Sequence, residues 1–227
     1  MIFGSQHARS SLRLLLLLIC LPSVASAQFY AGALGGLTTL SGDAKSVIGP
    51  DGSAFSLYKP ENGPAIRFFA GRHLTDYLSL QADYGWNRND LTLSATSTSP
   101  QGETLYQEAR GSSEQSVLGN LLPYFRNRKS WARPYLSVGT GFVRFHSEEA
   151  SISALAGSPT LPPAKFNSVA VALRVAVGID MTLHGRWAFR YTFSETIRDN
   201  PVSAVLSPPG QRNLAIFQNL FGVVKTF

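Results

Sequence analysis

Cysteine is almost absent from this chain. The single cysteine, Cys20, lies in an apolar N-terminal stretch. Without that stretch the protein has no disulfide, no thiolate metal site and no cysteine nucleophile. Charged residues make up only 15 % of the chain, and no basic run suggests a nucleic-acid partner despite a formal net charge of +6. Beyond the N-terminal stretch no apolar run approaches the roughly 18 residues that a membrane-spanning helix needs.

The N-terminal stretch has the order of features of an export signal. A basic start is followed by an unbroken apolar run and then by the small residues Ala25–Ala27. This order predicts a secretory signal peptide over residues 1–27, cleaved before Gln28, with residues 28–227 as one domain. A lipoprotein signal around Cys20 is the alternative, but an isoleucine precedes that cysteine where a small residue is expected. Export leaves a soluble periplasmic β-protein or an outer-membrane one.

The most regular part of the remaining chain runs from Ser168 to Phe193. Every second residue of its first half is apolar: Val169, Val171, Leu173, Val175, Val177, Ile179 and Met181. The residues between them are small or charged, so a strand here has one apolar face and one small or charged face. A short turn follows, and then aromatic residues alternate with Arg190 and Thr192. Long strands of this kind are typical of transmembrane β-barrels, with the apolar face toward lipid.

The same alternation recurs along the chain. It predicts eight strands, over residues 28–39, 65–74, 77–87, 116–125, 134–145, 168–181, 187–193 and 213–227. Long connections alternate with short turns, as they do in barrels that keep short turns in the periplasm and long loops outside. The sequence therefore predicts an all-β fold, an eight-stranded antiparallel up-and-down transmembrane β-barrel of the bacterial outer membrane.

The C-terminal strand adds a recognisable ending. It carries Gly222 and the terminal Phe227, although Lys225 stands where a second aromatic residue is usual and Leu220 where a polar residue is common. With this ending the chain resembles the OmpA/OmpX-like superfamily of eight-stranded outer-membrane β-barrels, over residues 28–227. The resemblance implies outer-membrane lipid and the barrel-insertion machinery as partners, the latter through Gly222 and Phe227.

Charged residues fall on the small-residue face of several strands. An arginine on the lipid face near mid-bilayer would cost about 2–4 kcal/mol, so these residues are expected to point inward, where buried charges need partners. The predicted lumen polar cluster is Asp83, Arg174, Arg190 and Gln81, with Arg67, Glu114 and Asp180 as possible additions. The favoured interpretation is a structural plug of ion pairs, and a proton or ion path is the alternative.

Aromatic residues gather near the expected strand ends: Tyr84, Trp86, Trp187, Tyr191, Phe193, Phe221 and Phe227. Such rings prefer the level of the lipid headgroups, so they are interpreted as interfacial girdles. A sugar-stacking site is the alternative.

The alternation changes phase after Asn87, which suggests a β-bulge near residues 87–90. Beyond it, apolar residues on two facing segments predict a hairpin that rises above the membrane: Leu91, Leu93, Leu105 and Tyr106. An unpaired strand edge is a template for a partner's strand. This ribbon is therefore the predicted site for an extracellular partner.

Candidate chemistry is sparse. His146, Ser147 and Glu148 resemble the residue types of a lipid A deacylase barrel, but neighbouring strand residues face opposite sides and the spacing departs from the His-x-Ser pattern. No catalytic residue, cofactor or metal site is predicted. Three hypotheses remain: a non-enzymatic outer-membrane barrel with a structural or surface-interaction role through its long outer loops, a lipid-modifying barrel enzyme, and a soluble periplasmic lipocalin-like binder.

Overall fold

The computed structural model describes residues 28–41, 44–47, 55–97, 101–157, 161–202 and 213–227. The predicted signal peptide, residues 1–27, lies outside this part. The strands within the described ranges are β1 (Phe29–Ser41), β2 (Ala44–Val47), β3 (Phe55–Pro60), β4 (Gly63–His73), β5 (Leu78–Thr96), β6 (Thr104–Pro123), β7 (Ala132–Ser147), β8 (Asn167–His184), β9 (Trp187–Asp199) and β10 (Asn213–Thr226). No helix in the described part of the chain is long and apolar enough to cross a membrane.

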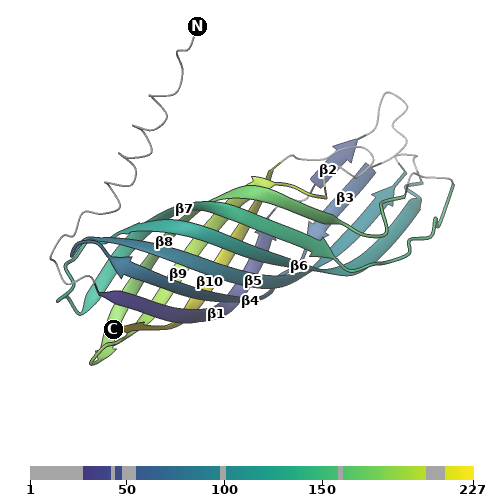
Figure 1. Ribbon diagram of the computed structural model, residues 1–227. Coiled ribbons are helices and arrows are strands. Elements are labelled where there is room, and N and C mark those ends of the chain that lie inside the picture. The colour runs from purple at the N-terminus through teal and green to yellow at the C-terminus, as the bar shows by residue number, and fades with distance from the viewer. Residues whose placement is uncertain (1–27, 42–43, 48–54, 98–100, 158–160, 203–212) are drawn as a thin grey trace, which may run out of the picture.

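Eight of these strands close into a ring (Figure 1). The order is β5-β4-β1-β10-β9-β8-β7-β6, and the pairing of β6 with β5 completes the circle. Each neighbouring pair is antiparallel. The predicted eight-stranded antiparallel barrel is therefore confirmed.

The two ends of the barrel differ in their connections. The beginning of β1 and the C-terminus lie at one end, with the short turns at residues 74–77, 124–131 and 185–186. Gly185 has a φ of 59°, which most residues disfavour and which a tight hairpin turn requires. The long connections and the strand extensions lie at the other end. In a barrel inserted from the periplasm, the end with the short turns is the periplasmic one.

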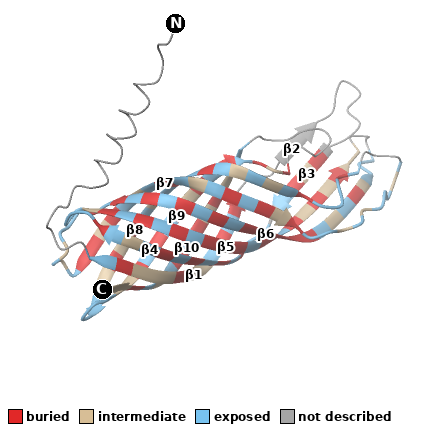
Figure 2. Ribbon diagram, viewed as in Figure 1, coloured by how far each residue is buried: buried red, intermediate tan, exposed pale blue. Residues whose placement is uncertain are grey.

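Burial alternates along every barrel strand, as the two-residue repeat of the colours in Figure 2 shows. On β8, Val171 is 66 % exposed on the outer wall, whereas Arg174 is 3 % exposed and faces the lumen. The outer wall is apolar, and it carries most of the predicted girdle residues with their rings exposed, among them Tyr84, Trp187 and Phe221. This arrangement is the reverse of a soluble lipocalin, whose interior is apolar.

The predicted bulge near residues 87–90 is wrong. β5 pairs with β6 in unbroken register from Leu78 to Ala95, and the only irregularity of this pair lies between Ala95 and Thr96. The inward-facing positions simply change chemistry along the strand, from Asp83 to Leu91, with no change of face. In a transmembrane barrel, lipid surrounds the wall below this level and water surrounds it above. The apolar residues therefore move from the outside to the inside at the point where the sheet leaves the bilayer.

The loop predicted for residues 41–64 contains two strands that the sequence reading missed. β3 pairs with the upper part of β5, and β2 pairs with β3, so a four-stranded sheet of β2, β3, β5 and β6 projects beyond the ring (Figure 1). The predicted loop from residue 195 is also too long, because β9 continues in register with β10 as far as Asp199.

An apolar core, here called the cap cluster, fills the extracellular end of the barrel. Its members are at most 4 % exposed: Leu40, Tyr58, Leu91, Leu93, Ala95, Tyr106, Phe145, Phe166, Val202, Leu214 and Ile216. The predicted ribbon must be corrected accordingly. The hairpin forms, but Leu91, Leu93 and Tyr106 face this core rather than a partner, Leu105 is half-buried against it, and β3 covers the outer edge of β5.

Candidate functional site

The lumen contains three polar groups stacked along the barrel axis. The lowest is built around Arg190 of β9, which is 1 % exposed. Its Nε and Nη2 donate to the two carboxylate oxygens of Asp180 at 2.5 and 2.7 Å. Its Nη1 donates to Gln81 at 2.8 Å, and Nη2 also donates to the Tyr124 hydroxyl at 3.0 Å. This two-pronged arginine–carboxylate geometry is the strongest form of ion pair.

Aromatic rings complete the lowest group. The guanidinium carbon of Arg190 lies 4.7 Å from the ring centroid of Phe69, 5.0 Å from that of Tyr135 and 5.6 Å from that of Tyr30. Cations are attracted to ring faces, more strongly when water is excluded. The rings therefore offset part of the cost of burying this charge.

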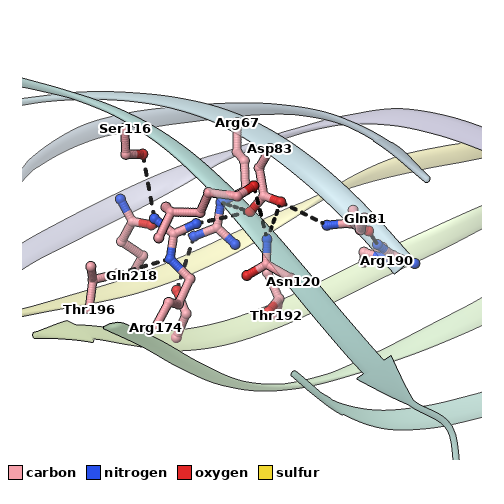
Figure 3. Close-up of polar contacts among 12 residues, drawn as sticks. Arg67, Gln81, Asp83, Ser116, Asn120, Arg174, Arg190, Thr192, Thr196 and Gln218 are labelled. Atoms are coloured by element: carbon pink, nitrogen blue, oxygen red, sulfur yellow. Dashed lines mark hydrogen bonds and ion pairs between the residues drawn. The ribbon is translucent and has the colours of Figure 1, made fainter. Parts of the chain in front are cut away.

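Asp83 of β5 holds the middle group together (Figure 3). One of its carboxylate oxygens accepts from Arg174 Nη1 at 2.9 Å and lies 3.9 Å from Arg67 Nε, while Asn120 donates to the other at 2.5 Å. Arg174 Nε donates to the Thr196 hydroxyl at 2.9 Å. Further polar side chains complete the donor and acceptor set of the two arginines: Ser116, Ser194 and Gln218.

The upper group is the buried ion pair between Arg198 and Glu114. The Arg198 guanidinium lies 5.4 Å from the ring centroid of Phe145, which belongs to the cap cluster. Between the middle and upper groups is a cavity of about 10 Å³, room for roughly one water molecule. Gln81, which donates to Asp83 at 3.3 Å, connects the lowest group to the middle one.

All four residues of the predicted lumen polar cluster lie inside the barrel: Asp83, Arg174, Arg190 and Gln81. The three possible additions, Arg67, Glu114 and Asp180, lie there too. Three further lumen residues are not predicted from the sequence. Asn120 follows the alternation of β6, and Tyr124 lies directly after that strand. Arg198 lies on the part of β9 beyond the predicted strand end.

The candidate catalytic residues are not arranged for catalysis. His146 lies on the outer wall with its Nδ1 2.6 Å from the Asn167 side-chain oxygen. Ser147 is buried, and its hydroxyl accepts from the amide of Phe166 and donates to the carbonyl of Glu148. The hydroxyl therefore ties down the start of the following loop instead of meeting a base. Within the described ranges no group of three or more His, Cys, Asp or Glu side chains could hold a metal ion.

The end of the chain forms part of the wall that closes the barrel. The amide of Phe227 donates to the carbonyl of Phe29 at 2.9 Å, and the Phe227 ring is 58 % exposed at the periplasmic rim. Lys225 lies 5.3 Å from the ring centroid of Trp187 and 5.4 Å from that of Phe227. Lys225, at the position where a second aromatic residue is usual, thus contacts two rings of the predicted girdle.

Gly222 of β10 lies close against the backbone of β1. A Cβ atom there would collide with the carbonyl oxygen of Ala33. We therefore expect Gly222→Ala to destabilise the refolded barrel by about 1–3 kcal/mol, the range of overpacking, as measured by urea unfolding in vesicles. Gly35→Ala is the matched substitution on the same seam, since the nearest atom to its Cβ is 4.0 Å away, and it should unfold like the wild type. If Gly222 acts only as an insertion signal, Gly222→Ala will lower assembly in cells and leave unfolding in vesicles unchanged.

The fold and the filled lumen define the class of protein, an outer-membrane β-barrel. The family model described as "Outer membrane protein beta-barrel domain" matches residues 11–208, and the chain belongs to this family. The localisation in the bacterial outer membrane follows from the family, and it excludes the soluble lipocalin-like alternative.

Solved structures support the fold. Neisserial surface protein A is 16 % identical, with a TM-score of 0.55 over 88 % of this chain and 97 % of that one. OprG of Pseudomonas aeruginosa is 11 % identical, with a TM-score of 0.50 over 88 % and 96 %. A search of curated protein sequences finds no match.

Proposed function

We propose that this protein is a non-enzymatic outer-membrane barrel whose closed body anchors an extracellular sheet for surface interaction. The observation that carries the proposal is the filling of the lumen. Three ion-pair groups and the cap cluster occupy it at successive levels, and a ring of eight strands is just wide enough for side chains to fill. The contacts in the lumen thus stabilise the barrel, and the extracellular surface is the part proposed to bind other molecules.

The closed body has a direct electrical test. Purified protein in planar bilayers should give no step conductance, because an ion would have to displace the Arg190–Asp180 and Arg198–Glu114 pairs and then cross the apolar cap cluster. Reproducible conductance steps from the folded protein would contradict the plug and favour the ion path. Incubation of the same preparation with lipid A, followed by mass spectrometry, should show no loss of an acyl chain.

The surface role has a more specific location than the predicted ribbon. β7 pairs with β6 only from Ser112 onward, so the outer edge of β6 above that point lacks a strand partner. Two backbone amides of the loop after β7, those of Leu155 and Glu148, donate hydrogen bonds to the carbonyls of Leu105 and Gly111 on this edge. Gln107 and Ala109 are exposed and lie between Leu105 and Gly111. By strand alternation their backbone N–H and C=O groups point to the same side as the carbonyl of Gly111. Within the described residues no loop segment bonds to these groups. This short edge is our proposed site for a partner's strand.

The edge can be tested on intact cells. A photo-crosslinking residue at position 107 should capture one discrete partner, and Ala109→Pro should abolish the product because it removes an outward-facing N–H without touching the cap cluster. The same crosslinker at Val171, on the lipid-facing wall, is the matched control. A product that survives Ala109→Pro would exclude strand addition as the mode of binding.

A further inference from the structure

The periplasmic end of the lumen opens into a cavity of about 230 Å³, here called the vestibule. Its floor is the Arg190–Asp180 pair. Around the floor it is lined by polar side chains from different strands and turns, notably His73, Arg128, Arg133, Thr182 and Arg186. The cavity is several times larger than one water molecule needs.

Arg133 is the unusual member of this lining. Its residue is 8 % exposed, yet no carboxylate of the described residues, the C-terminal one included, lies within 4.0 Å of its guanidinium. Its Nη2 donates to the backbone carbonyl of Asp76 at 3.1 Å, the guanidinium stacks 3.9 Å from the ring centroid of Tyr124, and its Nε is buried without a partner. A buried charge is costly unless an opposite charge accompanies it. Arg133 therefore lacks a counter-ion, and it lies beside an open cavity.

The two nearby side-chain carboxylates are already engaged. Asp180, the direct cross-strand neighbour of Arg133, forms its two-pronged pair with Arg190. Asp76 accepts from Arg128 Nε at 2.7 Å, and this hydrogen bond lowers the pKa of the Asp76 carboxyl below its usual value. Arg186, on the exposed turn at the rim, has no ion-pair partner among the described residues. Positive charge thus exceeds negative charge around the vestibule.

We propose that the vestibule binds a small phosphate-type oxyanion between Arg133 and Arg186. Guanidinium groups present parallel N–H donors that match phosphate oxygens, and two arginines lining one cavity suit a group with two negative charges. The Thr182 hydroxyl and the His73 ring, whose Nδ1 is held 2.6 Å from the Ser79 hydroxyl, supply further polar lining. The oxyanion supplies the counter-ion that Arg133 lacks.

Inorganic phosphate is the first probe. The full barrel, refolded in an uncharged maltoside detergent, is titrated with sodium phosphate and, at matched ionic strength, with sodium chloride, and binding is followed by calorimetry. Phosphate should bind saturably with one site per barrel, and chloride should not compete at equal concentration. Arg186→Gln should weaken phosphate binding at least tenfold. Since Arg186 lies on an exposed turn, this variant keeps the barrel fold, which the mobility of the folded form in gel electrophoresis verifies.

Arg126→Gln is the matched control, because Arg126 is an exposed arginine at the same end that does not line the vestibule. It should bind phosphate like the wild type. Arg133→Gln should lose binding even where the folded fraction is unchanged. The proposal is overturned if phosphate heat matches that of chloride, or if Arg186→Gln and Arg126→Gln bind phosphate equally.

A second titration separates two sources of the same chemistry. Short-chain phosphatidylglycerol added to the micelles tests an inner-leaflet lipid headgroup. If it displaces bound phosphate from the wild type but not from Arg186→Gln, the vestibule accepts a lipid phosphate. If it displaces nothing, free phosphate or a small phosphorylated solute is the occupant. Either result supports the site, whereas the absence of binding by both probes contradicts it.

Discussion

Replacing Asp180 with asparagine should destabilise the folded barrel by about 3–5 kcal/mol, the cost of breaking a buried ion pair by removing one partner. Arg190 would keep its charge at 1 % exposure and lose its one carboxylate contact among the residues that the structure describes. The neighbouring arginine Arg133 would add repulsion, since Asp180 also lies beside it. Urea unfolding in vesicles, followed by tryptophan fluorescence and by the gel mobility of the folded form, measures the change.

An exposed ion pair provides the comparison. Arg88 and Glu148 form a contact of 2.9 Å with side chains that are 53 % and 59 % exposed. Glu148→Gln should therefore cost less than about 1 kcal/mol, as surface pairs do. An Asp180→Asn variant that unfolds at the same urea concentration as Glu148→Gln would show that the lumen is hydrated and that its ion pairs are not buried.

Placing an arginine at Val177 should cost about 2–4 kcal/mol, since the side chain would face lipid near the middle of the bilayer. Val177 is 49 % exposed on the outer wall, and its cross-strand neighbours are Leu136 and Phe193. Equilibrium unfolding from vesicles gives the free energy, and the yield of inserted protein should fall in parallel.

Val169→Arg is the depth control on the same strand. Val169 is also an outward-facing valine, but its cross-strand neighbour is Arg144, so that level already tolerates a cation. The cost there should be about 0–1 kcal/mol, as at the bilayer interface. Equal costs at 177 and 169 would mean that the wall of β8 does not span the bilayer as described.

The alternation of residue types was sufficient to predict which face of the charged membrane strands points inward. Asp83, Arg174 and Arg190 could be assigned to the lumen because the lipid face excludes their charge. Their pairing could not be predicted. Asp83 and Arg174 are 91 residues apart in the sequence and meet across the barrel, so only the closed ring brings them into contact. The choice of Asp180 for Arg190 is local, since the two residues face each other on adjacent strands of one hairpin.

The extracellular part was harder to predict, because the chemistry reverses there. The phase change before Leu91 and Leu93 suggests a bulge, whereas the strand continues straight and the surrounding solvent changes. β3 lies in a turn-rich segment whose pairing partner, the upper part of β5, is distant in the sequence. The sequence predicts a loop at Arg198, because no apolar alternation marks the end of β9. The alternation pattern alone does not show where the surroundings of a strand change from lipid to water. It therefore could not predict that the apolar side chains turn inward above that level.

The central claim is that a closed polar interior lies behind an apolar wall in contact with lipid. Spin labels at Val175 and Ala176 test it most directly, because the two residues are neighbours at similar depth on opposite faces of β8. The label at 175 should relax strongly with oxygen, which dissolves in lipid, and weakly with a water-soluble nickel chelate. The label at 176 should be shielded from both reagents by the packed lumen. Strong relaxation by nickel at 176 would reveal a water-filled channel, and strong relaxation by nickel at 175 would place the apolar wall outside the bilayer.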